Sequence, residues 1–365
     1  MITAMQNTPS SERPNTRKSV PLQKSGAAAN GSQTQKQTPH TAQKQPQPAA
    51  QQPNNSKKKK NKKFYVEWKK IFCFLLVVIL LFGGTLGAFL KLHVFAEYEH
   101  SEVSYGDSVD RSTLVSSPFV KNILLIGQDI NDIDVDSRSD TMMLISLDVK
   151  HCRINMVSFL RDTYCEIPGY YPTKLNAACS FGGPSLLIET LEYNYNIKID
   201  GYARVGFDLL EIIIDAIGGV TIPEIDETES AALKASFKVD IAPATNVHLD
   251  GKHALMYCRI RKYQSDFYRT ERQREVISQI IKGIAVDDIV PLLQVVPDLL
   301  SRIDCSFSEW ELTAIAAQAV LCMIGGIEQQ HIPADGTWWD ETINGQAVLQ
   351  IHWDENRAIL KDFLY

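Results

Sequence analysis

Five arginines fall within eighteen residues of this chain, in the segment CRIRKYQSDFYRTERQRE from Cys258 to Glu275. The segment also contains Asp266 and Gln273, and an apolar run with helical spacing begins directly after it at Val276. Guanidinium groups bind carboxylate and phosphate oxygens through planar, paired hydrogen bonds. The arginines therefore indicate an anion-binding site or, as charge runs usually do, a solvated helix with intrahelical ion pairs. They are Arg259, Arg261, Arg269, Arg272 and Arg274.

A helix that begins near Ser265 or Asp266 separates these side chains by face. At about 100° per residue, the polar side chains on the face of the following apolar run are Arg269, Arg272 and Gln273. The side chains that point elsewhere are Glu271, Arg274 and Glu275. Burying a guanidinium group without a counter-charge is costly, so an anionic group should lie beside the first set. A substitution of Arg274 is expected to be nearly silent.

Two aspartates lie at the ends of short apolar runs that are typical of buried strands. The runs cover residues 122–127, 141–147 and 154–160; Asp129 follows the first and Asp140 precedes the second. Magnesium prefers oxygen ligands and keeps water molecules for a phosphate partner, so these aspartates are candidate Mg²⁺ ligands. The alternative is that they only cap turns.

Arg138 and Arg161 add two guanidinium groups at the same strand ends. Together with Arg259, Arg261 and Arg269 they would form a cluster suited to several anionic oxygens. Bidentate donors beside a divalent cation are typical of a pyrophosphate site, where they stabilise charge on a leaving phosphate. A nucleotide is not indicated, because the chain has neither a P-loop nor a G-x-G-x-x-G motif.

Strand and helix patterns alternate from residue 118 to residue 365, which predicts an α/β fold with a central mixed sheet flanked by helices. A fourth strand is predicted over 202–207, and the stretch 250–258 fits either a helix that begins at Asp250 or a strand. Residues 333–346 are predicted to form a turn-rich loop. Helices are predicted over 184–195, 208–217, 291–300, 309–323 and 354–363.

The N-terminal part differs sharply from this domain in charge. Residues 1–70 carry fourteen Lys and Arg against two Asp and Glu, a net charge of +12, whereas the rest of the chain has 23 basic and 41 acidic residues, a net charge of −18. The tail lacks apolar periodicity and is predicted to be disordered. No nucleic-acid partner is expected, because no recognition motif accompanies its basic run.

Residues 71–90 contain no charged side chain. As a helix they would span roughly 30 Å, the thickness of a bilayer core, so they are predicted to form a single transmembrane anchor. The lysines of 57–63 precede this span, which places the N-terminus in the cytoplasm and residues 118–365 outside the cell membrane. Residues 91–117 are predicted to be a polar stalk.

Six cysteines fall in the predicted external part. Disulfides are allowed there but not required, because a domain of this size can fold without them. No C-x-x-C pair is present, which argues against a zinc site. Scattered buried thiols are therefore expected.

Several motifs of the chain resemble, in the same order, those of the LytR-CpsA-Psr family of bacterial cell-wall ligases. They are KNILLIGQD, RSDTMMLISLD, INMVSFLRDTYCEIPG, KLNAACSFGGP, IDAIGGV and R-x-R followed by D-x-x-R-T-x-R-Q. They extend over residues 119–285, whereas the C-terminal extension 286–365 matches the motifs poorly. The resemblance implies an enzyme that moves a glycopolymer, such as teichoic acid or capsular polysaccharide, from a polyprenyl-pyrophosphate carrier to peptidoglycan.

The resemblance also implies a role for each matching residue. Asp129 and Asp140 would hold Mg²⁺, Asp266 would be the general base for the acceptor hydroxyl, and Arg161 and Arg269 would act with it in catalysis. The residues that bind pyrophosphate would be Arg138, Arg161, Arg259, Arg261, Arg269, Gln273 and Lys174. The lipid chain would lie in an apolar tunnel lined by the stripes 186–191, 209–217 and 276–284, which an ordinary core would also show.

One position departs from the family pattern. Tyr268 stands where the family commonly has glycine, which bears on substrate preference more than on the type of reaction. Two alternatives to an enzyme remain: a non-catalytic receptor that binds anionic wall polymer through the same arginines, and a membrane-bound transcriptional attenuator. The attenuator would require DNA binding by residues 1–70.

Overall fold

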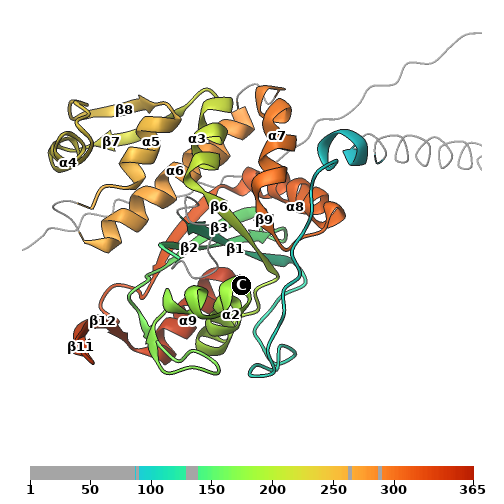
Figure 1. Ribbon diagram of the computed structural model, residues 1–365, viewed down its shortest axis with the longest axis vertical. Coiled ribbons are helices and arrows are strands. Elements are labelled where there is room, and N and C mark those ends of the chain that lie inside the picture. The colour runs from blue at the N-terminus through green and yellow to red at the C-terminus, as the bar shows by residue number, and fades with distance from the viewer. Residues whose placement is uncertain (1–86, 88–89, 129–138, 262–264, 287–289) are drawn as a thin grey trace, which may run out of the picture. The chain divides into compact units, whose positions relative to one another are not determined.

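The computed structural model describes residues 87, 90–128, 139–261, 265–286 and 290–365. A mixed six-stranded sheet forms the centre of the domain, with strand order β10-β3-β2-β1-β6-β9 (Figure 1). The predicted strands β1 (Val120–Gln128), β2 (Thr141–Asp148) and β3 (Arg153–Phe159) are antiparallel neighbours. β6 (Gly201–Gly206) runs parallel to β1, and β10 (Ile327–Ile332) runs parallel to β3. β9 (Asp304–Cys305) is the short strand beside β6.

Alternation along β2 sends apolar side chains to both faces of the sheet. Met142 and Leu144 pack on one face, against helices α2 (Ala177–Tyr195) and α9 (Trp353–Leu364). Met143 packs on the other face, with side chains of α6 (Asp266–Val286) and α8 (Glu309–Cys322). Figure 1 shows α2 and α9 on one side of the sheet and α6 and α8 on the other. The predicted α/β fold with helices on both faces is therefore confirmed.

The predicted helix ends are recognisable in the structure. α3 (Phe207–Ala216) ends before Gly218 and Gly219, whose φ angles of 82° and 101° favour glycine. α2 is interrupted at Gly182 and Gly183, so its regular part begins at the predicted Pro184. α7 (Val290–Arg302) corresponds to the helix predicted over 291–300.

Helix α5 (Gly251–Cys258) shows that the helical alternative was correct for residues 250–258. The Asp250 carboxylate accepts a hydrogen bond from the His253 amide at 2.8 Å and thus caps the first turn. α6 begins at Asp266, as the sequence predicts. The arginine-rich segment therefore runs from the end of α5, through a short connection, into α6.

A second apolar cluster joins α3, α5 and α6 to three elements that the sequence patterns do not predict. They are β7 (Val220–Ile225), α4 (Glu227–Phe237) and β8 (Ala244–Leu249), of which β7 and β8 pair antiparallel. Side chains from β7, α4 and β8 are buried in this cluster together with Tyr257 and Val276. The side of α6 that faces away from β3 packs in this cluster, and this packing fixes the position of the helix.

The C-terminal residues form a hairpin where a loop is predicted. β11 (Trp338–Ile343) and β12 (Gln346–Ile351) pair antiparallel around Asn344 and Gly345, whose φ angles are 52° and 77°. Asn-Gly suits a two-residue hairpin turn because both central positions need positive φ. The loop prediction for 333–346 is therefore wrong over its second half. The remaining short elements are β4 (Tyr164–Cys165), β5 (Thr173–Lys174), η1 (Leu90–Val94) and η2 (Met323–Gly325).

The segment predicted as a stalk, residues 91–117, packs on the domain. Tyr98 is buried and its hydroxyl donates a hydrogen bond to the Phe307 carbonyl. Arg111 lies 2.9 Å from the Glu192 carboxylate, whose side chain is 1% exposed. A free spacer would make neither contact, so this segment belongs to the folded unit.

Within the described ranges, no helix has the length and apolar character needed to cross a membrane. The predicted tail 1–70 lies outside the described residues. So does the predicted span 71–90, apart from Gly87 and Leu90. The six predicted external cysteines are described and are free thiols, five of them buried.

Candidate active site

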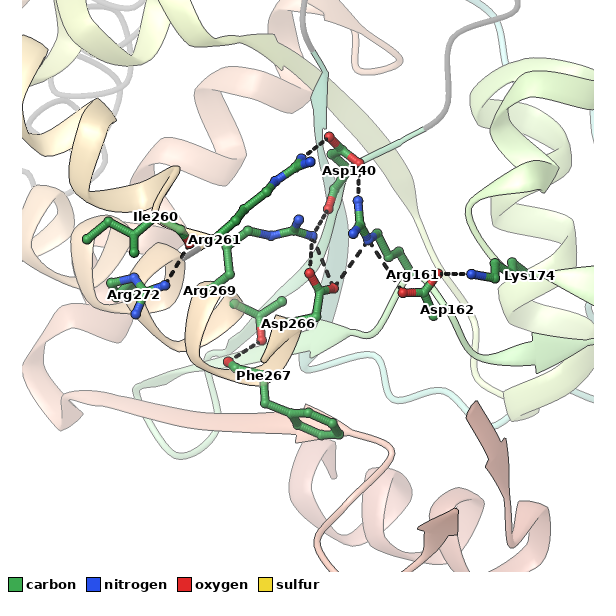
Figure 2. Close-up of polar contacts among 11 residues, drawn as sticks. Asp140, Arg161, Asp162, Lys174, Ile260, Arg261, Asp266, Phe267, Arg269 and Arg272 are labelled. Carbon is green, nitrogen blue, oxygen red and sulfur yellow. Dashed lines mark hydrogen bonds and ion pairs between the residues drawn. The ribbon is translucent and has the colours of Figure 1, made fainter. Parts of the chain in front are cut away.

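Asp140 lies immediately before β2 and is the meeting point of three arginines (Figure 2). Its carboxylate oxygens accept hydrogen bonds from Arg161 Nη1 at 2.7 Å and Arg261 Nη2 at 2.8 Å. Its backbone carbonyl accepts a hydrogen bond from Arg269 Nη2 at 3.1 Å. These arginines come from the end of β3, the segment after α5, and α6, so the fold unites residues that are far apart in the sequence.

The arginines also lower the pKa of the Asp140 carboxyl. Burial by itself raises the pKa of this carboxyl, but the hydrogen bond from Arg161 and the charges of Arg161, Arg261 and Arg269 outweigh burial and lower the pKa overall. Asp140 is therefore ionised at neutral pH. The cluster retains excess positive charge, because its four cations face three carboxylates. The cations are Arg161, Arg261, Arg269 and Lys174, and the carboxylates are Asp140, Asp162 and Asp266.

Asp266 is the first residue of α6 and the second carboxylate of the cluster. Its Oδ1 lies 2.9 Å from Arg269 Nη2, and its Oδ2 lies 3.4 Å from Arg161 Nε. Burial raises the pKa of Asp266 by more than the charges of Arg269 and Arg161 lower it. A carboxylate with a raised pKa is a stronger base than an exposed aspartate.

Arg269 is almost completely buried, with 2% of its surface exposed. Its Nη2 makes the contacts with Asp140 and Asp266, but its Nε and Nη1 are buried and find no hydrogen-bond acceptor among the residues that the structure describes. Buried donors without acceptors are unfavourable and are uncommon in folded proteins. They are donors that an anionic ligand would satisfy.

A cavity of about 390 Å³, here called the arginine cavity, lies beside this cluster. It is lined by Asp140, Phe207, Phe237, Cys258, Arg259, Arg261, Arg269 and Gln273. The predicted inward direction of Arg269 and Gln273 is thus confirmed. Gln273 is 8% exposed, and its Oε1 has no hydrogen-bond partner in the described part of the chain.

A second, apolar cavity of about 150 Å³ adjoins the arginine cavity, since Phe207, Cys258 and Gln273 line both. Side chains of β1, β2, α3 and α6 form its walls, among them Leu210 and Ile280. Two of the three predicted stripes, 209–217 and 276–284, therefore contribute to one apolar space. The third stripe, 186–191, does not, because α2 lies on the opposite face of the sheet and packs with α9.

Not every predicted residue reaches the arginine cavity. Lys174 does not line it, because its Nζ contacts Asp162 Oδ1 at 2.6 Å on the far side of Arg161 (Figure 2). Asp162 is a member of the cluster that the sequence analysis leaves without a role, although it directly follows Arg161. The predicted ligands Asp129 and Arg138 lie outside the described residues. Among the residues that are described, no group of three or more His, Cys, Asp or Glu is placed to hold a metal ion.

Two further arginines of α6 are buried for different reasons. Arg272 donates to the Ile260 carbonyl at 2.8 Å and lies 3.4 Å from Glu229 Oε1, so the anionic neighbour predicted for this face is a carboxylate of α4. Arg274 does not line the arginine cavity, as predicted, but it is only 6% exposed. The expectation that a substitution of Arg274 is nearly silent rested on the helix alone, which did not predict this burial.

The fold and these cavities place the chain among α/β proteins in which an arginine-lined space adjoins an apolar one. The model of the LytR_cpsA_psr family matches residues 91–362. The chain therefore belongs to the LytR-CpsA-Psr family, as its motifs predict. The match includes both the segment predicted as a stalk and most of the C-terminal extension.

Two relatives that this chain resembles are named as teichoic acid transferases. The polyisoprenyl-teichoic acid–peptidoglycan teichoic acid transferase TagU of Oceanobacillus iheyensis is 31% identical over 283 residues, which cover 74% of this chain and 85% of the relative. The corresponding transferase TagT of Bacillus subtilis is 30% identical over 240 residues, covering 61% of this chain and 74% of the relative. A solved structure described as "TagT bound to LIIa-WTA" has the same fold, with a TM-score of 0.60 and 24% identity, and the match covers 73% of this chain and 98% of that one.

Proposed function

We propose that this protein is a membrane-anchored phosphotransferase that moves a glycopolymer from a polyprenyl-pyrophosphate carrier to peptidoglycan. The observation that carries the proposal is the contiguity of the arginine cavity and the apolar cavity. A lipid pyrophosphate combines an anionic head group with an apolar chain, and these two spaces suit its two parts. The names of the relatives favour teichoic acid as the polymer.

In the proposed reaction, Asp266 accepts the proton of the acceptor hydroxyl while the hydroxyl oxygen attacks the phosphorus atom that carries the glycopolymer. A new O–P bond forms, and the bond from that phosphorus to the bridging oxygen of the pyrophosphate breaks. Polyprenyl monophosphate leaves with the electron pair of the broken bond. Arg261 and Arg269 stabilise the charge that develops on this leaving group.

Magnesium is the proposed cofactor, held by Asp140 together with Asp129. Asp140 fits this role because the arginines keep its carboxyl ionised, and carboxylate oxygens are ligands that Mg²⁺ prefers. Arg161 and Arg261 orient the same carboxylate through its two oxygens. When bound, the ion would neutralise charge on the pyrophosphate.

The proposed location is the cell membrane, with residues 71–90 as the anchor, the N-terminus in the cytoplasm and the catalytic domain outside. The uncharged stretch and the lysines that precede it support this topology. The domain begins within a few residues of the stretch, since η1 starts at Leu90. The site would therefore be held near the membrane that contains the lipid carrier.

The test uses the full-length chain in detergent micelles with a lipid-pyrophosphate glycan, Mg²⁺ and peptidoglycan. Lipid monophosphate should be released and a glycan–peptidoglycan phosphodiester should form. Arg161→Ala and Asp140→Ala should each slow the release by about 10²- to 10³-fold, whereas Arg302→Ala, at an exposed position of α7, should not. Unchanged turnover in both site variants would refute the assignment.

A receptor that only binds wall polymer makes a different prediction. It would bind the polymer without releasing lipid monophosphate, and its binding would not depend on Mg²⁺. Titration with EDTA, with binding and turnover followed in parallel, separates the two functions. Loss of turnover with binding retained supports the enzyme.

A further inference from the structure

A third cavity, of about 630 Å³, lies on the other side of Asp266 from the arginine cavity. Here it is called the aromatic cavity, because Phe267, Tyr268, His331 and Trp338 contribute to its walls. Its acidic lining residues are Asp162, Asp266, Glu271, Asp335 and Asp340, and its one arginine is Arg274. Of this set, the site described above uses Asp266 and Asp162.

Arg274 is the unusual member of the lining. It is 6% exposed, and its Nε and Nη1 are buried and find no hydrogen-bond acceptor among the described residues. The carboxylate whose charge acts on it is that of Glu271, which also lines the cavity. Arg272, two residues earlier, shows a more complete arrangement, in which a buried guanidinium faces a carbonyl and a carboxylate. A buried cation with unsatisfied donors is costly, and a further anion beside it would lower that cost. Arg274 lines the aromatic cavity, so an anion bound there would lie beside its guanidinium group.

The aromatic rings give this cavity a surface suited to a sugar. Phe267 stacks on Trp338, with ring centroids 4.7 Å apart and planes 27° apart, and His331 meets the Phe267 ring edge-on at 5.3 Å. Flat apolar rings pack against the C–H faces of a pyranose, and carboxylates such as Asp335 and Asp340 accept hydrogen bonds from its hydroxyls. The lining therefore combines sugar-binding groups with a buried guanidinium, that of Arg274, of which two donors lack acceptors among the described residues.

The helix geometry places Asp266 between the two spaces. At about 100° per residue, Arg269 lies roughly 60° to one side of Asp266 around α6, and Arg274 lies roughly 80° to the other. Arg269 lines the arginine cavity, Arg274 lines the aromatic cavity, and Asp266 is paired with Arg269 at 2.9 Å. A hydroxyl bound in the aromatic cavity could thus give its proton to Asp266 on the side opposite the bound pyrophosphate.

We infer that the aromatic cavity binds the acceptor glycan and that Arg274 receives a carboxylate carried by that acceptor. The inference rests on the proposed function, because it assumes that Asp266 activates an acceptor hydroxyl. Arg274 is then a specificity residue for an acidic acceptor, and the aromatic rings orient its sugar.

The experiment measures binding, so it does not depend on turnover. The full-length chain in micelles is titrated by calorimetry with a peptidoglycan disaccharide that has a free lactyl carboxylate, and with the carboxamide of the same disaccharide. The wild-type chain should bind the acid about tenfold to a hundredfold more tightly than the amide, the range expected for hydrogen bonds to a charged group. An amide that carries a peptide stem with free carboxylates shows whether the sugar or the peptide supplies the anion.

Two variants show which residue the preference for the acid depends on. Arg274→Met should abolish the preference for the acid and leave the affinity for inorganic pyrophosphate unchanged, whereas Arg261→Met should weaken pyrophosphate binding and keep the preference. Arg274→Met should lower the unfolding temperature little, because the loss of the Glu271 charge interaction is offset by removal of a buried charge whose Nε and Nη1 find no acceptor among the described residues. Arg274→Lys should restore part of the preference.

The outcomes are distinguishable. Equal affinity of the wild-type chain for acid and amide overturns the inference even if no variant can be prepared. A preference that survives Arg274→Met, or pyrophosphate affinity lost with that variant, also overturns it. If the acid binds through Arg274 but no lipid monophosphate is ever released, the proposed reaction fails while the binding site stands.

Discussion

Replacement of Arg269 by methionine separates the catalytic contribution of this residue from its structural one. The substitution removes the ion pair with Asp266 at 2.9 Å and the hydrogen bond to the Asp140 carbonyl at 3.1 Å. It also removes the two buried donors that find no acceptor among the described residues. Breaking a buried pair costs about 3–5 kcal/mol, and each buried donor without an acceptor costs about 1–3 kcal/mol in the wild-type protein. The two effects oppose each other, so the free energy of unfolding should fall by no more than about 3 kcal/mol.

The loss of activity should be much larger. Each prearranged donor to a developing anionic charge contributes about 2.7–4 kcal/mol to the transition state, so Arg269→Met should lower kcat about 10²- to 10³-fold. Arg269→Lys keeps the charge but not the planar set of donors, and its kcat should lie between those of Arg269→Met and the wild type. The rate is measured as release of lipid monophosphate at saturating acceptor, and stability is measured by urea unfolding.

A second readout follows from the charge of Arg269. This charge lowers the pKa of Asp266, against the larger effect of burial, so its removal should raise that pKa further. The acid limb of kcat/KM for the residual activity should therefore move to higher pH. If turnover stays within threefold of wild type, or if unfolding alone accounts for the loss, Arg269 does not act on the leaving phosphate.

Three other substitutions probe separate parts of the site. Asp266→Asn should reduce kcat about 10²- to 10⁴-fold and remove the acid limb of the pH profile, and a profile that keeps its limb would show that another group is the base. Arg272→Met should lower the free energy of unfolding in urea by about 1–3 kcal/mol, because it leaves the half-buried Glu229 carboxylate without its cation, and an unchanged midpoint would contradict this. Ile280→Phe should fill part of the apolar cavity and raise KM for a long-chain lipid donor but not for a short-chain one, and equal effects on both would argue against a lipid site.

Four strands of the central sheet, β1, β2, β3 and β6, were predictable because they are short, mostly apolar runs. The edge strands were not predicted, since β9 has two residues and β10 carries polar side chains at most of its positions. The start of α6 was also predictable, because Asp266 precedes a long run with helical spacing. The β7–α4–β8 unit gave a weaker pattern: the strand β7 contains Pro223, and β8 has one fully buried residue. Such elements are defined by packing against α5 and α6 rather than by their own sequence.

The arginines illustrate what a helical face can and cannot predict. Periodicity correctly placed Arg269 and Gln273 on the side of the arginine cavity, since this side continues the apolar stripe of the same helix. It could not predict that Arg274 lines a cavity together with His331 and Trp338, because these residues lie far along the chain from α6. The Asn344–Gly345 turn was the available signal that residues 338–351 form a hairpin, which supplies part of the lining of that cavity.

Lys174 shows the same limit for a charged residue. Its motif position implied contact with pyrophosphate, but the closest anion in the folded chain is Asp162 at 2.6 Å. Sequence spacing gives the type of group that a site contains, whereas the partner of each group depends on which strand ends and loops meet. Here the end of β3 places Asp162 between Arg161 and Lys174.

A single helix thus supplies polar groups to both sides of the proposed reaction. Because Arg269 and Arg274 are five residues apart, they project from α6 roughly 140° apart, with Asp266 between them at the first turn. A spacing of four or seven residues would have placed both arginines on one face and in one cavity. The five-residue spacing instead directs one guanidinium to the arginine cavity and the other to the aromatic cavity. The proposed base then lies where an acceptor hydroxyl and a pyrophosphate would meet, which is the arrangement that direct transfer requires.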